Sequence, residues 1–211
     1  MEDRLTPALH LERCDASPDE YAARAADLAG HEGVERVTWW LPQVRGRTDV
    51  PMRMAEFGLL GVIEADASFE PPDPPDGGEG HHFRRTPRPG QGQLSGRPTL
   101  GLLVVMISPR DPGGAQDLRD WGDFVHLRHI AAAAPPGYTM ITPYENATGG
   151  EPRFLHFYEM DTDEPEAAYR GMTPLVEERL GPPGTPAFDD WAWHEQLWIE
   201  SVGTYRLEGS T

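Results

Sequence analysis

Residues 117–161 read DLRDWGDFVHLRHIAAAAPPGYTMITPYENATGGEPRFLHFYEMD, and this stretch decides the fold. It predicts an amphipathic helix, a Pro-Gly turn and two alternating strands. An α-helix has about 3.6 residues per turn, so one stripe of the predicted helix contains Leu118, Trp121, Val125, His129 and Ala132. The sequence therefore predicts that His129 points inward, at a position where a plain core would have an aliphatic side chain.

The composition excludes several classes of function. The net charge of −17 argues against a nucleic-acid or anionic-membrane partner, because both select clustered basic residues. All 18 basic residues are Arg, so no lysine amine can form a Schiff base. A single cysteine, Cys14, excludes an internal disulfide and a multi-cysteine zinc site. Neither a secretory signal pattern nor a run of ~20 apolar residues occurs, so we expect a cytoplasmic protein.

The pattern of elements predicts an α+β chain of two tandem ferredoxin-like units. A first, incomplete unit at 1–69 has strands at 8–14, 34–43 and 57–65 and a helix at 18–29, with Ser17 as its N-cap. The segment 70–98 is rich in Pro, Gly and charge, and we expect a mobile linker. A complete β-α-β-β-α-β unit follows at 99–211, with strands at 99–108, 138–145, 153–160 and 197–207 and helices at 115–133 and 164–180.

The same residues resemble the dimeric α/β-barrel superfamily, and within it the EthD-like group. The resemblance rests on the aromatics Trp121 and Phe124, on Arg128-His129-Ile130, on the turn Pro136-Gly137-Tyr138 and on the strand 154–159. Three positions depart from the family pattern: Arg128 replaces an acid, Ala131 a proline and Pro143 an arginine. The resemblance implies that the two units close into one barrel within the chain. We expect a cavity inside that barrel, the usual place for a small-molecule site on such a scaffold.

The resemblance further implies an enzyme without a bound cofactor that acts on an aromatic or polyketide-like carbonyl compound by proton transfer. The reaction would be that of a dehydratase or cyclase (a lyase), or of a cofactor-independent monooxygenase. A buried, neutral His129 could serve as general base. The predicted catalytic residues are His129, Tyr144, His156 and Tyr158, and the predicted substrate-binding residues are Trp39, Trp40, Trp121, His126 and Arg128. Trp39 and Trp40 alternate along a strand, so only one indole can enter the interior.

Several alternatives stay open at this level. His129 could be a core histidine bonded to a carbonyl or to Tyr144. His126 and His129 could bind a metal with a third ligand such as Glu145, His156 or Glu159, although no compact metal motif is present. The basic and histidine cluster within 81–88 could bind a phosphate or a metal rather than being a solvated linker. The whole chain could be a non-catalytic binder of a hydrophobic metabolite or a haem or metal protein, and it is compatible with further dimerisation.

Overall fold

The computed structural model describes residues 6–211. Residues 1–5, assigned above to the first unit, lie outside the described part. The first half contains β1 (Ala8–Cys14), α1 (Pro18–Leu28), β2 (Val34–Pro42), β3 (Leu59–Ala65), β4 (Glu79–Arg85) and the short β5 (Gln91–Gly92). Ser17 caps α1 as predicted: its backbone N–H donates to the Glu20 carboxylate at 2.9 Å, and its hydroxyl accepts from the Glu20 backbone N–H at 3.4 Å.

The second half contains β6 (Gly101–Pro109), the 3₁₀ turn η1 (Pro112–Gly114), α2 (Ala115–Trp121), the π turn η2 (Gly122–His126), α3 (Leu127–Ala133), β7 (Tyr138–Asn146), β8 (Phe154–Met160), α4 (Pro165–Leu180), α5 (Pro186–Ala192) and β9 (Leu197–Ser210). The predicted single helix at 115–133 is thus three consecutive segments with a wide turn in the middle. None of the helices within residues 6–211 is long and apolar enough to cross a bilayer.

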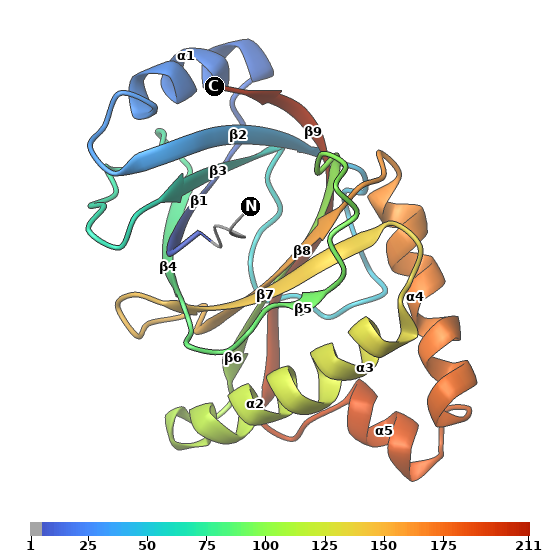
Figure 1. Ribbon diagram of the computed structural model, residues 1–211. Coiled ribbons are helices and arrows are strands. Elements are labelled where there is room, and N and C mark those ends of the chain that lie inside the picture. The colour runs from blue at the N-terminus through green and yellow to red at the C-terminus, as the bar shows by residue number, and fades with distance from the viewer. Residues whose placement is uncertain (1–5) are drawn as a thin grey trace.

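The strands form one antiparallel barrel (Figure 1). Their order is β4-β1-β3-β2-β9-β6-β8-β7, and β4 pairs with β7 to close the ring. Each half contributes four strands in the same order, with its fourth strand beside its first. The two halves meet at two seams, β2 with β9 and β4 with β7. The short β5 extends the sheet on β7, beside the end of β4. This arrangement confirms the predicted α+β fold with a barrel shared by two ferredoxin-like units.

The segment 70–98 differs from the prediction of a linker without regular structure. It contains β4, which pairs with β1 over six residues and with β7 over three. β4 is the fourth strand of the first unit, so only that unit's second helix is missing. The sequence did not predict β4 because EGHHFRR has almost no apolar side chain. Within this strand, Phe83 alone is fully buried. Its partners on both edges, rather than its own hydrophobicity, order this strand.

The two faces of the barrel wall have different partners. Its interior is a packed core, as is usual for eight strands, with Trp40 and Tyr144 among the buried side chains. The expected interior cavity is therefore reduced to about 220 Å³ at one end, lined partly by Tyr144, Glu64 and Glu159. The helices cover the outer face (Figure 1): α1 packs on the first half, and α2 to α5 pack on the second.

Candidate functional site

A π turn in the helix after β6 determines which histidine faces the sheet. The backbone N–H of Leu127 donates to the carbonyl of Gly122, five residues earlier, so η2 holds one residue more than an α-helical turn. Every later side chain is rotated by about 100° relative to the α-helical prediction. Leu118 and Trp121 are buried as predicted, but beyond the turn the buried positions are Leu127 and Ile130. The prediction that His129 points inward is wrong, because the π turn shifts the buried stripe away from this position.

His129 is half-buried instead, on the flank of α3. Within residues 6–211, the side chains that line the apolar cavity described below do not include His129. Its neighbour His126, in the π turn, does line that cavity. The catalytic role of His129 is not tested by this placement and stays a prediction. The shift by one residue gives His126 the inward position that the periodicity assigned to Val125, and it gives Ile130 that of His129.

Gly122 allows the helix to lie directly on the sheet. A Cβ atom at this position would be 3.1 Å from Nε2 and Cε1 of His156 on β8. Only a residue without a side chain lets the turn approach this ring without displacing it. The close approach of Gly122 therefore brings the π turn and the β8 histidine into one site.

That site is a cavity of about 290 Å³ between the outer face of β6, β8 and β9 and the helices of the second unit. We call it the histidine cavity, because His126 and His156 line it. Aliphatic and aromatic side chains form most of its wall, and no Arg, Asp or Glu of the described chain lines it. Few of the described side chains that line it are polar. The residues used below are Trp121, His126, His156, Tyr158 and Trp191.

The imidazole of His126 is fixed in one tautomer. Its Nδ1 lies 3.0 Å from the backbone carbonyl oxygen of Trp191, and because a carbonyl only accepts, Nδ1 carries the proton. The ring stacks on the Trp191 indole at 5.4 Å between centroids and lies 5.0 Å from that of Trp121. Burial lowers the pKa of His126 and outweighs the hydrogen bond to Trp191, which acts to raise it; the charge of His129 adds a smaller lowering effect. At neutral pH the ring is therefore neutral, and Nε2 holds a lone pair.

His156 and Tyr158 project from β8 on the same face. His156 is 3% exposed, and burial, followed by the charge of His126, lowers its pKa to about 3. Neither of its ring nitrogens hydrogen-bonds to any residue within 6–211. Burial, with Tyr138 and Tyr169 nearby, raises the pKa of Tyr158 well above its ordinary value. Both groups stay neutral across the physiological range, and each can donate a hydrogen bond to a ligand oxygen.

The structure thus brings together four of the nine predicted site residues: His126, His156, Tyr158 and Trp121. The others lie elsewhere. Tyr144 and Trp40 are inside the barrel, and Trp39 lies against Tyr21 of α1 at 6.4 Å between rings. The alternation of the two indoles is as predicted, but neither lines the histidine cavity. Trp191 and Gly122 were not predicted as site residues, because a lone indole or glycine carries no periodic signal.

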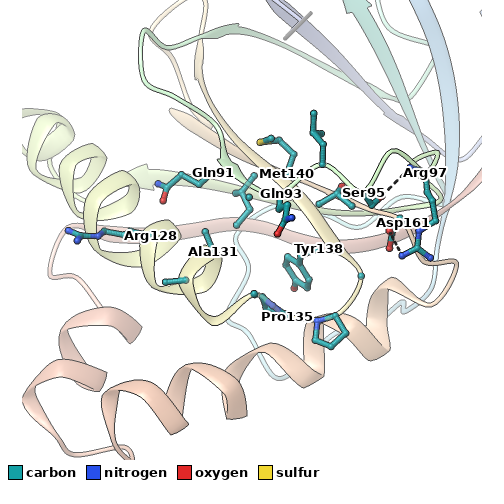
Figure 2. A pocket seen from close by; sticks show the side chains of 18 residues that line it. Gln91, Gln93, Ser95, Arg97, Arg128, Ala131, Pro135, Tyr138, Met140 and Asp161 are labelled. Carbon is teal, nitrogen blue, oxygen red and sulfur yellow. Dashed lines mark hydrogen bonds and ion pairs between the residues drawn. The ribbon is translucent and has the colours of Figure 1, made fainter. Parts of the chain in front are cut away.

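Arg128 belongs to a separate, larger groove of about 790 Å³ beside α3 and β5 (Figure 2). Figure 2 shows Arg128 at one end of this groove and the pair of Arg97 and Asp161, 2.9 Å apart, at the other. No histidine lines the groove among the described residues. It therefore has no group with the proton-accepting lone pair that His126 offers, and we regard the smaller histidine cavity as the functional site.

Metal ligation has little support in this geometry. No three His, Cys, Asp or Glu side chains from residue 6 onward lie close enough together to hold a metal ion. Of the third ligands considered from the sequence, His156 lines the same cavity as His126, whereas Glu145 and Glu159 are engaged elsewhere. Glu145 pairs with Arg153 at 2.5 Å, and Glu159 accepts from Thr99 at 3.1 Å inside the barrel.

Comparison with known proteins identifies the fold. No protein-family model and no curated relative matches the sequence. Solved structures do match. An anthrone oxidase-like protein covers 100% of this chain and 94% of its own, with a TM-score of 0.57 and 13% identity. A candidate monooxygenase from Fusobacterium nucleatum covers 98% and 94%, with a TM-score of 0.57 and 7% identity. A chlorite dismutase variant from Candidatus Nitrospira defluvii covers 97% and 92%, with a TM-score of 0.54 and 9% identity.

These matches and the closed ring of strands show that the chain has the dimeric α/β-barrel fold, as the sequence resemblance implied. The matched chains align along nearly their whole length. Identities of this level show the fold alone. Assignment to the EthD-like group stays a prediction.

Proposed function

We propose that this protein is a small-molecule enzyme that removes a proton from a neutral aromatic carbonyl compound in the histidine cavity. One observation carries the proposal: the Trp191 carbonyl fixes the proton of His126 on Nδ1 and leaves the Nε2 lone pair available in an apolar cavity. A neutral imidazole oriented by a hydrogen bond on its other nitrogen is the usual arrangement of a general base.

The proposed step uses three side chains. Nε2 of His126 takes a proton from a carbon conjugated with the substrate carbonyl, directly or through an aromatic ring, and the C–H electron pair moves onto the carbonyl oxygen to give an enolate. The resulting imidazolium donates from Nδ1 to the Trp191 carbonyl. An N–H of His156 or the hydroxyl of Tyr158 donates to the enolate oxygen, which stabilises the charge that develops there. His156, with a pKa of about 3, is too weak a base to compete with His126 for the proton.

The cavity also limits the substrate. A volume of about 290 Å³ is at the lower end of the range for small-molecule sites. Aromatic walls suit a flat ring system, with Trp121 and Trp191 available for stacking. Because no arginine from residue 6 onward lines the cavity, a carboxylate or phosphate on the substrate would be buried there without a cationic partner. We therefore infer a neutral aromatic ketone or phenol of a few rings.

The likeness to an anthrone oxidase-like protein and to a candidate monooxygenase favours oxygenation over dehydration as the second half of the reaction. In that case the enolate carbon adds to dioxygen, and the hydroperoxide loses water to leave a new carbonyl. A methylene group and one dioxygen give one carbonyl and one water. In the dehydratase variant the same carbanion would expel a hydroxyl group from the adjacent carbon, and the proton held by the His126 imidazolium would pass to that group, which leaves as water.

Haem binding is the alternative that the sequence left open, because Nε2 of His126 could ligate iron. The cavity does not fit the group. About 290 Å³ is too small for a tetrapyrrole, and no arginine within residues 6–211 lines the wall to pair with two carboxylates. The residues present suit a smaller, uncharged ligand.

The decisive experiment measures proton transfer directly. An aromatic ketone with acidic C–H bonds, such as anthrone, is incubated with the protein in D₂O, and loss of the C–H signal is followed by NMR without dioxygen. Catalysed exchange that disappears in His126→Gln is the expected result. Oxygen uptake upon admission of air then separates oxygenase from dehydratase chemistry. Ligand-induced quenching of Trp fluorescence without any exchange or product would instead establish a binding protein and refute the proposal.

A further inference from the structure

The π turn that carries His126 needs support from outside the helix, because wide turns are uncommon and less favourable than α-helical ones. On its inner side it lies against His156 through Gly122. On its outer side it meets residues 86–100, which join β4 to β6 and which we call the inter-unit segment. The sequence gives no reason to expect this segment near a site in the second unit.

Arg88 of the inter-unit segment makes three contacts with the helix. Its Nη2 lies 2.5 Å from the Asp120 carboxylate, and its Nε lies 3.3 Å from Oδ2 of Asp123. Its guanidinium group covers the ring of Phe124 at 4.5 Å. One side chain therefore contacts the last turn of α2 and two consecutive residues of the π turn.

A second side chain of the segment supports the same turn. The amide of Gln91 donates to the backbone carbonyl of Asp123 at 2.8 Å. Asp123 itself is 4% exposed, so its carboxylate depends on Arg88 and the neighbouring Arg119 for compensation of its charge. Loss of Arg88 would leave this buried acid largely unpaired and remove the main fixed contact on the outside of the turn.

We propose that Arg88 is a positioning residue for His126: by holding Asp120, Asp123 and Phe124 it stabilises the π turn and thereby sets the inward orientation of the His126 ring. The segment that links the two units would then control the site of the second unit. The part that concerns catalysis rests on the proposed function, whereas the part that concerns the orientation of His126 does not.

The test measures the tautomer and the pKa of His126 directly. Histidine ¹⁵N NMR spectra are recorded over a pH titration for the wild type, Arg88→Met, Arg88→Lys and Arg97→Met. Arg97 lies in the same segment but pairs with Asp161, far along the chain from the π turn. In the wild type and in Arg97→Met, we expect the Nδ1–H tautomer of His126 with a lowered pKa. In Arg88→Met, we expect a tautomer mixture and a pKa that moves toward that of a free histidine, with Arg88→Lys in between.

Asp123→Asn removes the same ion pair from the helix side. If Arg88→Met does not fold, the same NMR titration of Asp123→Asn tests the proposal. Unchanged His126 signals in folded Arg88→Met or in Asp123→Asn would overturn the proposal. In the exchange assay, a misplaced base should lower turnover by about 10- to 100-fold in Arg88→Met. If the wild type shows no exchange with any ketone, the proposed function fails, while the NMR comparison still decides whether Arg88 positions His126.

Discussion

His126 and Trp191 are joined by two hydrogen bonds in opposite directions. Nδ1 of His126 meets the carbonyl oxygen of Trp191 at 3.0 Å, and Nε1 of Trp191 donates to the carbonyl oxygen of His126 at 3.2 Å. The two residues are 65 positions apart in the chain, in the π turn and in α5. This reciprocal pair fixes both the tautomer of the imidazole and the plane of the indole, so it determines which nitrogen faces a substrate.

The first prediction separates the two histidines of the H-x-x-H sequence. His126→Gln should lower the rate of proton exchange by about 10² to 10⁴, the usual contribution of a general base. His129→Gln should change it little, because its ring does not line the cavity. Rates are compared at substrate saturation for both variants, together with their melting curves. A loss confined to His129→Gln would restore the role that the sequence first suggested for His129.

The second prediction concerns the pH dependence of stability. His10 and His156 have pKa values of about 3 in the folded protein, mainly because burial disfavours the imidazolium. In the unfolded chain they titrate near 6.5. Between these values the unfolded state binds more protons, so stability is complete above about pH 6.5 and falls as the pH decreases. Each group should cost about 2 kcal/mol between pH 7 and pH 5.

Asp123 acts in the opposite direction, because burial raises its pKa to about 6 in the folded state and thus favours folding as the pH falls. Asp123 therefore offsets part of the loss that the buried histidines cause. Urea unfolding at pH 7 and pH 5 measures the net change, and His156→Asn should flatten the dependence. Equal stability of the wild type at both pH values would show that these imidazoles are not buried as described.

The fold was predictable to a large extent because its signals are local and repeated. The strand TLGLLVVMIS, the amphipathic helix and the Pro-Gly turn each predict their own element, and β-α-β-β-α-β follows from their order. β4 was not predictable in the same way. Its sequence EGHHFRR is ordered by β1 and β7, which are partners that no local window contains.

The site was predictable only in part, for a single geometric reason. Periodicity assumes a uniform helix, and one extra residue in the turn at Gly122–His126 shifts the inward stripe by one position, from Val125 to His126 and from His129 to Ile130. The π turn depends on contacts from His156 and Arg88, which come from distant strands and loops. His156 and Tyr158 lie on the face of β8 that the helices cover and not on the face that lines the barrel interior.

The third prediction uses the tryptophans to locate the ligand. Trp121 and Trp191 line the histidine cavity, whereas Trp40 is inside the barrel. An aromatic ketone should therefore quench the fluorescence of the wild type and of Trp40→Phe, and Trp191→Phe should lose much of the response and some affinity. Titrations of the three proteins with the same ketone provide the comparison. Loss of quenching in Trp40→Phe alone would place the ligand in the barrel and refute the site.

The fourth prediction tests the packing of the first unit with two matched glycines. Gly61 lies on β3 beneath Tyr21 of α1, and a Cβ there would be 1.7 Å from the tyrosine hydroxyl oxygen. That hydroxyl donates to the fully buried Glu12 at 2.9 Å. Gly61→Ala must displace Tyr21 and break this bond, so it should destabilise the protein by about 1–3 kcal/mol.

Gly171 provides the control. It lies within α4, exposed, and a Cβ there would meet nothing within 4 Å. Because alanine is the better helix former, Gly171→Ala should stabilise the protein by roughly 0.5–1 kcal/mol. The same chemical change thus has opposite signs at two positions, and chemical denaturation of both variants measures them. If Gly61→Ala were as stable as Gly171→Ala, the close contact between α1 and β3 would not exist as described.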